Sequence, residues 1–225
     1  MKSKKILLIS LFFILAVIII FILTTENTLE AYLVHKDSLS QKFYSTNISV
    51  EIVELNHESN QIFKPNEEIK KCPIVSNTSD VDIYIRAQIF VPIAKINYID
   101  EDDNIISPAD DIDLILFEYN LGQGWEKVTE EGFSGIVQDK EGNKFRVYTY
   151  KFTENEKEKI IKAREKIDIP VFENIKIINY LDIEKAMDLK LIVKAIAVQC
   201  LDEKLPNEMW EFYKNQNSSG ISEVD

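Results

Sequence analysis

The sequence is poor in the residue types on which several large classes of protein depend. Its 225 residues include two His, two Cys, six Gly and six Pro, and 26 Lys and Arg stand against 38 Asp and Glu, for a net charge of −12. Low Gly and Pro content excludes a collagen-like chain, and the lack of a repeating sequence unit excludes a solenoid. The deficit of positive charge argues against binding of nucleic acid. Because 45 % of the residues are hydrophobic, we expect one packed domain, or two small ones, with protein or cation partners.

Motifs of the common enzyme classes are incomplete. A zinc peptidase helix carries two histidines one turn apart with a glutamate between them. His57 and the Glu after it begin this pattern, but Gln61 stands at the second histidine position, and the other histidine, His35, lies far away in the sequence. Residues 132–135 approach a nucleophile elbow, but their second Gly comes one position early, so we interpret them as a bend entering a strand. We therefore expect no catalytic residue, no resident metal and no cofactor.

An acidic segment between residues 97 and 113 raises the question of calcium, which prefers several oxygen ligands. Asp100, Asp102 and Asn104 have the spacing that starts an EF-hand-like loop, but Ile105 replaces the required Gly and Asp111 stands where a Glu is needed. We expect a solvated acidic loop, and low-affinity calcium binding stays an open alternative.

The N-terminus carries a membrane-insertion signal. Lys2, Lys4 and Lys5 precede the apolar run from Ile6 to Leu23. At 1.5 Å per residue a helix of this length reaches roughly 27 Å, just enough to cross a bilayer core. The basic end is expected to stay in the cytoplasm, so everything after about residue 30 is expected outside.

Two fates remain open for this segment. Its length favours an uncleaved anchor, whereas Ala31 offers the small residue at which a signal peptidase cuts, before Tyr32. Removing residues 1–31 takes away three Lys and two Glu and leaves 23 basic and 36 acidic residues, a net charge of −13. We therefore predict a signal peptide or anchor over 1–31, a folded domain over 32–214 and a polar flexible tail over 215–225.

Period-2 alternation of apolar and polar residues predicts β-strands. Residues 81–91 place Val81, Ile83 and their odd-numbered successors on one face, with Tyr84, Arg86 and Gln88 on an opposite, wet face. Further strands are expected at 47–55, 113–119, 133–138, 144–152, 174–180 and 190–200, and residues 139–143 are expected to form a hairpin loop.

One helix is expected over 153–166, because Thr153 and Glu156 have the spacing of a capping box and Pro170 bars continuation. Many short strands with one helix predict an all-β antiparallel sandwich.

The two cysteines leave two alternatives. Cys72 and Cys200 lie on expected strands of an exported chain, where a disulfide is chemically permitted. Two free thiols that pack as small hydrophobic side chains are the other interpretation.

Several short motifs follow one another in a fixed order: Ala31 to Leu33, Asn47 to Val50, Pro65 to Thr78, Tyr84 to Ala87, Trp125, Val147 to Lys151, Pro170 to Phe172, Leu191 to Gln199, and Trp210. Together they resemble the TasA/camelysin (CalY) family, which Gram-positive bacteria secrete with a dedicated SipW-type signal peptidase. In that family a Pro-Gly turn precedes a Pro-x-Val-x-Asn-x-Gly strand and a Tyr-(Val/Ile)-Arg strand. This chain departs from the pattern at Asn66 and Ser79, where Gly is usual, in its cysteines and in the expected helix.

The resemblance implies a jelly-roll β-sandwich that assembles into extracellular biofilm matrix fibres, alone or with other matrix proteins. It also implies that the N-terminal segment of one subunit, here Tyr32, Leu33 and Val34, is donated as a strand to its neighbour. Cleavage after Ala31 would release this segment from the membrane. The resemblance to camelysin implies one alternative, a cell-surface metallopeptidase. The long apolar run leaves open another, an uncleaved membrane-anchored binding module.

Overall fold

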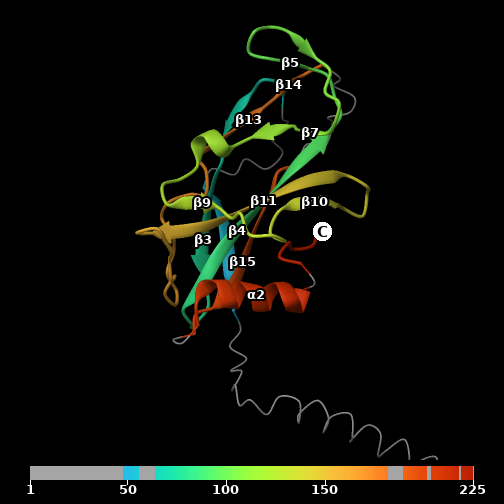
Figure 1. Cartoon of the computed structure of the whole chain (residues 1–225). Helices are drawn as coiled ribbons and strands as arrows, with labels where there is room; N and C mark the ends of the chain where they lie inside the picture. Colours follow the sequence, from blue (N-terminus) through green and yellow to red (C-terminus); the bar gives the residue numbers. More distant parts are fainter. Residues whose placement is uncertain (1–47, 56–63, 182–189, 202–203, 218, 225) are drawn as a thin grey trace, which may run out of the picture. The chain divides into compact units, whose positions relative to one another are not determined.

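The structure is a computed structural model that describes residues 48–55, 64–181, 190–201, 204–217 and 219–224. These residues belong to one compact unit, Thr46–Asp225. They form strands β1 to β15, a short 3-10 helix, η1 (Glu118–Asn120), and one α-helix, α2 (Pro206–Asn217) (Figure 1). All strand pairs are antiparallel, which confirms the predicted all-β class.

The main sheet is built around β4 (Ile83–Ala94). β4 pairs with β11 (Lys144–Glu154) on one side and with β15 (Ile192–Gln199) on the other. β10 (Gly135–Gln138) and β9 (Trp125–Lys127) pair with opposite ends of β11. Two short strands complete the sheet, namely β7 (Ile112–Asp113) beside β4 and β12 (Lys157–Glu158) beside β11.

A second layer faces the main sheet. Its centre is β3 (Cys72–Asn77), which pairs with β1 (Val50–Leu55) on one side. On the other side β3 bonds to the irregular segment 165–173, where Ile167 N donates to Val75 O at 3.0 Å. The layer continues through β2 (Glu68–Lys70), β13 (Asn174–Ile177) and β8 (Ile115–Leu116). A small sheet of β14 (Asn179–Tyr180), β5 (Tyr98–Ile99) and β6 (Ile105–Ile106) lies at one end (Figure 1).

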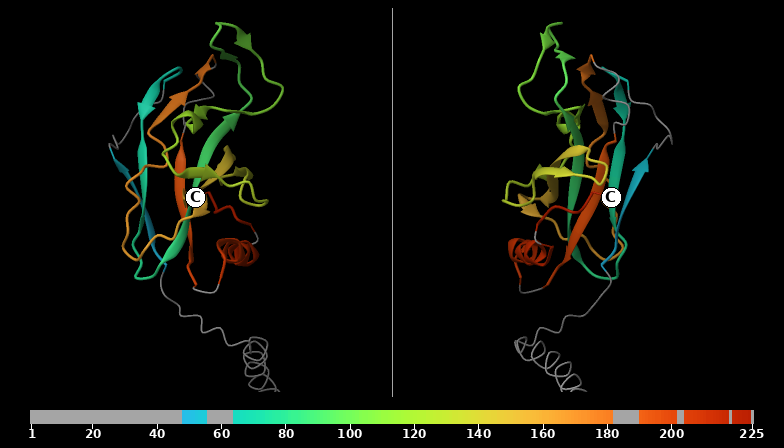
Figure 2. Two further views of the ribbon diagram at one scale, coloured as in Figure 1. Left: turned by 60° about the vertical axis from the view of Figure 1, so that its left-hand side comes forward. Right: turned by 90° about the vertical axis from the view of Figure 1, so that its right-hand side faces the viewer.

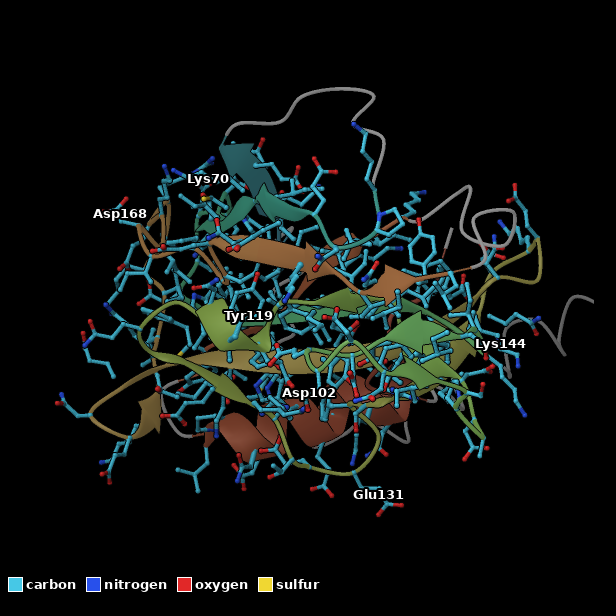
Figure 3. All side chains as sticks on the ribbon, turned by 90° about the horizontal axis from the view of Figure 1, so that it is seen from above. Lys70, Asp102, Tyr119, Glu131, Lys144 and Asp168 are labelled. Carbon is cyan, nitrogen blue, oxygen red and sulfur yellow. The ribbon has the colours of Figure 1, made fainter. Side chains whose placement is uncertain are left out.

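The core fills the space between these two layers. The odd-numbered positions of β4 from Ile83 to Val91 are at most 1 % exposed and pack against residues of the second layer such as Val75 and Ile175. Burial of one such side chain contributes roughly 1.5–3 kcal/mol, so the alternation in the sequence decides which face of β4 points inward. Exposed charged side chains lie around the periphery in the view from above, for example Lys144 and Asp168 (Figure 3).

The other face of β4 is not wet, which corrects the sequence prediction. Tyr84, Arg86 and Gln88 are 5 %, 0 % and 0 % exposed. They are covered by α2 and by residues 219–224, which lie on the side of the main sheet away from the second layer (Figure 2). The segment expected to be a flexible tail is thus a third layer of the domain.

The helix predicted over 153–166 is absent from these residues, all of which the structure describes. Instead β11 runs on to Glu154, and Asn155 and Glu156 turn the chain into β12 with φ of 52° and 64°. Thr153 Oγ1 bonds to Gly124 O at 3.0 Å and so does not cap a helix. The backbone of Ile161 bridges to β4. Long-range strand pairing therefore overrides the local capping pattern.

Most predicted strands are present. Segment 113–119 differs, because it divides into the end of β7, then β8, then η1. The loop 139–143 forms the predicted hairpin turn between β10 and β11, with Gly142 at φ 92°. Asp139 Oδ1 accepts hydrogen bonds from the backbone N of Glu141 and Asn143, and bonds to Asn143 lower the pKa of this aspartate.

Candidate functional site

The predicted N-terminal sites lie outside the described residues. These are the apolar span 6–23, the cleavage point at Ala31 and Tyr32, the donated residues Leu33 and Val34, and both histidines, His35 and His57. In the part of the chain that the structure describes, no helix is long and apolar enough to cross a bilayer.

The two cysteines are free thiols that lie in different layers, near opposite ends of β3. Cys72 is buried at the first position of β3, where its Sγ donates to Glu173 O at 3.6 Å. Cys200 follows β15 and bonds through its N to Asp82 O, near the far end of β3, where Asn77 Nδ2 donates to Val81 O. Five strand steps of about 3.3 Å separate the two ends, whereas a disulfide needs Cα atoms within about 7 Å. The structure therefore favours the alternative of two separate thiols.

The acidic segment is used for turns and ion pairs. Asp100 Oδ1 accepts from the backbone N of Asp102 and Asn104, which holds the β5–β6 turn. Asp111 pairs with Lys144, and Asp113 pairs with Arg146. Among the described residues no three His, Cys, Asp or Glu side chains gather closely enough to hold a metal ion.

One side of the domain is closed by the segment between β7 and β9. The Phe117 ring fills the gap between the layers, with its centre 5.7 Å from that of Tyr148 and 5.8 Å from that of Tyr150 on β11, and 5.4 Å from that of Phe172 in the second layer. Tyr150 OH donates to Glu118 Oε1 at 2.5 Å. The two layers are therefore tied together here by aromatic and polar contacts.

Burial and hydrogen bonds shift the pKa values of Tyr148, Tyr150 and Glu118 on this side of the domain. Burial, reinforced by the hydrogen bond to Asp113, raises the pKa of Tyr148 to about 12. Burial and the bond to Glu118 raise the pKa of Tyr150 as well. Burial alone would raise the pKa of Glu118, but hydrogen bonds from Lys127 and Tyr150 outweigh it and lower the pKa. The network thus keeps Tyr150 neutral beside the ionised carboxylate of Glu118.

At the opposite side of the domain the two layers end at the edges of β1 and β15. Among the described strands β1 pairs only with β3, and β15 pairs only with β4, so each presents one edge without a strand partner. β1 and β15 approach each other across this side. We call the two edges and the residues between them the open side.

Side chains on the open side point towards the core but are incompletely covered. They are only partly buried, although each packs against the core: Val50, Ile52, Val193, Ala195 and Ala197. Alanines at two inward positions of β15 leave less side-chain volume here than the isoleucines of β4 provide at the centre. Strand edges that have no strand partner among the described residues, beside incompletely covered apolar side chains, are candidates to accept one further strand.

A buried ionic cluster, which the sequence analysis did not identify, holds the third layer. Arg86 Nη2 lies 3.1 Å from Glu158 Oε2, and Arg86 Nη1 lies 2.8 Å from Glu130 Oε2. The guanidinium carbon is 4.5 Å from the ring centre of Phe133 and 4.4 Å from that of Trp210. Trp210 Nε1 also donates to Glu158 Oε1 at 2.7 Å. The signal in the sequence was an arginine at an even position of a strand whose other face is fully apolar.

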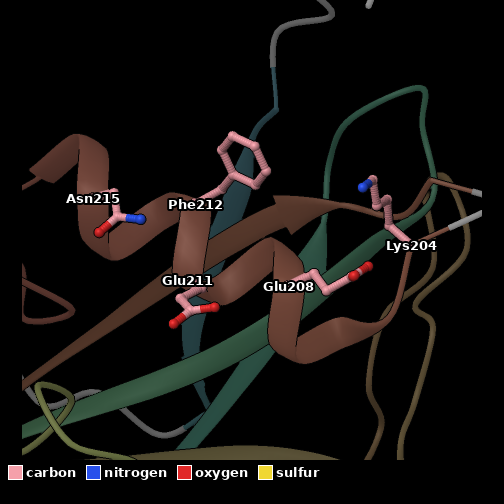
Figure 4. Close-up of a pocket in the computed structure, with 5 residues that line it drawn as sticks. All are labelled: Lys204, Glu208, Glu211, Phe212 and Asn215. Carbon is pink, nitrogen blue, oxygen red and sulfur yellow. The ribbon is translucent and has the colours of Figure 1, made fainter.

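The exposed side of α2 carries a hollow of about 240 Å³ (Figure 4). It is lined by Lys204, Glu208, Glu211, Phe212 and Asn215. Glu208 already accepts a hydrogen bond from the backbone N of Leu205 and so caps the first turn of the helix. The lining supplies no thiol, imidazole or hydroxyl group, and we interpret the hollow as a by-product of this cap.

Comparison with known proteins finds no family model, no curated protein and no solved structure that matches this chain.

Proposed function

We propose that this chain is an exported structural protein that assembles into extracellular fibres by donation of an N-terminal strand between subunits. The observation that carries the proposal is the open side, where β1 and β15 each have an edge without a strand partner among the described residues. A foreign extended segment can satisfy such an edge while its alternate side chains cover the apolar residues beside it.

The motifs behind the resemblance to the TasA/camelysin family have clear structural roles, which supports the proposal. Asn66 adopts φ 60°, the left-handed conformation for which Gly is usual. Asn77 is 1 % exposed, and its Nδ2 donates to Val81 O at 2.8 Å and to Lys162 O at 2.8 Å. Arg86 and Trp210, which lie far apart in the sequence, stack on each other. The two-layered antiparallel architecture is compatible with the jelly roll of that family.

The donated segment is Tyr32, Leu33 and Val34. It is apolar, it directly follows the proposed cleavage point at Ala31, and Ile48, the described start of the domain, lies 16 positions after Tyr32. Extended at about 3.3 Å per residue, this stretch reaches roughly 53 Å, enough to arrive at a neighbouring subunit. Signal peptidase is therefore a partner that releases the donor, and the product resides in the extracellular matrix or at the cell surface.

Electron microscopy of two chains tests the proposal, one beginning at residue 32 and the other at residue 39. We expect fibres from the first and none from the second. Equally abundant fibres from the shorter chain would refute strand donation.

A matched pair of variants locates the acceptor, because Ile52→Lys places a charge on the open side, whereas Ile136→Lys alters a residue that is 59 % exposed on β10. We expect Ile52→Lys alone to abolish fibres while circular dichroism shows that both variants fold.

The N-terminal residue of the protein recovered from cells distinguishes the membrane-anchored alternative from a released fibre subunit. A chain that begins at Tyr32 supports release, and a chain that begins at Met1 would remove the fibre mechanism. The metallopeptidase alternative gains no support from the described residues, since its two histidines, His35 and His57, lie outside them.

A further inference from the structure

Residues 219–224, which we call the strap, cross the outer face of the main sheet beyond α2 (Figure 2). The side chain of Gln88 on β4 is fully buried beneath them. Its Nε2 donates to Gly220 O at 2.6 Å, and its Oε1 accepts from Ser222 N at 2.9 Å and from Ser222 Oγ at 2.7 Å. The carboxamide thus bonds two backbone groups of the strap, the carbonyl of one residue and the N–H of the next but one, where the chain bends at residues 219–221.

The position of Gly220 accepts glycine alone. A Cβ at this residue would lie 2.5 Å from the Phe133 ring and 2.9 Å from Gly132 O. Phe133 cannot retreat, because its ring packs against the Arg86 guanidinium and the Trp210 indole. The surface beneath the strap therefore admits no side chain at this position.

Apolar contacts and a cation hold the rest of the strap. Val224 is 8 % exposed and packs in one cluster with Phe90, Phe145 and Val147 of the main sheet, and Ile221 packs beside it. Lys194 Nζ donates to Glu223 O at 2.6 Å. The contacts thus recognise a short sequence: glycine, an apolar residue, serine, and an apolar residue two positions further on.

We propose that this face of the main sheet is a peptide-binding groove and that its ligand between molecules is the strap of a second copy. The groove and the segment are present in every copy, so the contacts made within one chain can also be made between two. The helix is fixed independently, because α2 is held through Trp210 by Arg86 and Glu158, so the strap can leave the groove without loss of α2. In dilute solution the strap of the same chain occupies the groove through its high effective concentration, and exchange occurs where copies are crowded.

The strap contacts β15 through Ile192 and Lys194, whose side chains lie on the outer face of the main sheet, whereas the open side is formed by the edges of β1 and β15. A chain that begins at Thr46 contains the whole compact unit and lacks Tyr32 to Val34. Any association of this chain is therefore independent of strand donation.

Complementation between two variants tests the proposal. Gln88→Ala damages the groove and leaves the strap intact, whereas Gly220→Ala leaves the groove intact and displaces the strap. We expect each variant alone to be monomeric by light scattering and the equimolar mixture to double its mass. A mixture that stays monomeric while circular dichroism shows both variants folded would overturn the proposal. If Gly220→Ala does not fold, Ser222→Pro replaces it, since proline lacks the N–H that bonds Gln88.

Peptide binding provides a second measurement. A fluorescent peptide with the sequence of residues 217–225 is titrated into the Gly220→Ala chain, and anisotropy is followed. We expect saturable binding that weakens at least tenfold when the glycine of the peptide is replaced by alanine, and that weakens as much in the Gln88→Ala/Gly220→Ala chain. Equal affinity for the two peptides would contradict recognition by this groove.

Discussion

Removal of the buried charge of Arg86 gives the sharpest test of how the third layer is held. The side chain of Arg86 is 0 % exposed, and that of its partner Glu158 is 4 % exposed. In Arg86→Met the volume is largely kept, but Glu158 is left as a buried carboxylate that keeps the hydrogen bond from the Trp210 N–H and loses its cation. Breaking one half of a buried pair costs about 3–5 kcal/mol, and loss of a desolvated cation–π contact adds up to about 2 kcal/mol. We expect a loss of about 4 kcal/mol in the free energy of unfolding.

A double-mutant cycle separates the pair from the rest of the packing. Glu158→Gln leaves Arg86 with Glu130 at 2.8 Å, so we expect a smaller loss of about 3 kcal/mol. In Arg86→Met/Glu158→Gln both charges are gone, and the loss is expected near that of either single variant, well below their sum.

The assay is urea unfolding followed by far-ultraviolet circular dichroism, on the chain that begins at residue 39, which is expected to stay unassembled. Arg164→Met is the matched control, because Arg164 and its partner Asp80 are 63 % and 82 % exposed, and we expect its cost to stay below about 1 kcal/mol. Losses that add within about 0.5 kcal/mol in the double variant would refute the account of a coupled buried pair.

Three further outcomes are expected. Asn66→Ala should lower the free energy of unfolding by about 1 kcal/mol and Asn66→Gly should not, because Asn66 has φ 60°; thermal unfolding of both variants measures this. Burial raises the pKa of Tyr148 to about 12, so the folded chain resists ionisation of this residue. The free energy of unfolding should therefore fall between about pH 10 and 12, and should fall less in Tyr148→Phe. Tyrosinate absorbance during alkaline titration measures the ionisation. Hydrogen bonds from Lys162 and the Ala163 N–H lower the pKa of Asp82. Its contribution to the free energy of unfolding is therefore present above about pH 4 and is lost as the pH falls towards the lowered pKa. Acid unfolding of Asp82→Asn should show a weaker dependence on pH below about pH 4.

The strands could be predicted from the sequence because their signal is local. Alternation along β4 places Ile85 and Ile89 inward, and only a period of two residues satisfies both burial and the pleat. What alternation cannot tell is whether the second face meets water or another layer. Arg86 and Gln88 look like surface residues in the sequence, and they are buried only because Glu158, Trp210 and Gly220, which are distant in the chain, supply their partners.

The helix predicted over 153–166 failed for a related reason. The capping box at Thr153 is a local preference worth about 1 kcal/mol, and pairing of β11 with β4 and β9 outweighs it. The open side could not be predicted either, since the lack of a described strand partner at the β1 and β15 edges depends on which strands become neighbours. The strand-donation hypothesis named the donor from the sequence, while the candidate acceptor became visible only in three dimensions.

Phe133 connects features that are otherwise separate. Its ring lies edge-on to Trp210 at 5.9 Å between centres, and it blocks any side chain larger than that of glycine at position 220. Departure of the strap would uncover this ring and change the surroundings of the neighbouring indole. The intrinsic fluorescence of Trp210 should therefore distinguish an occupied groove from an empty one in the unlabelled protein.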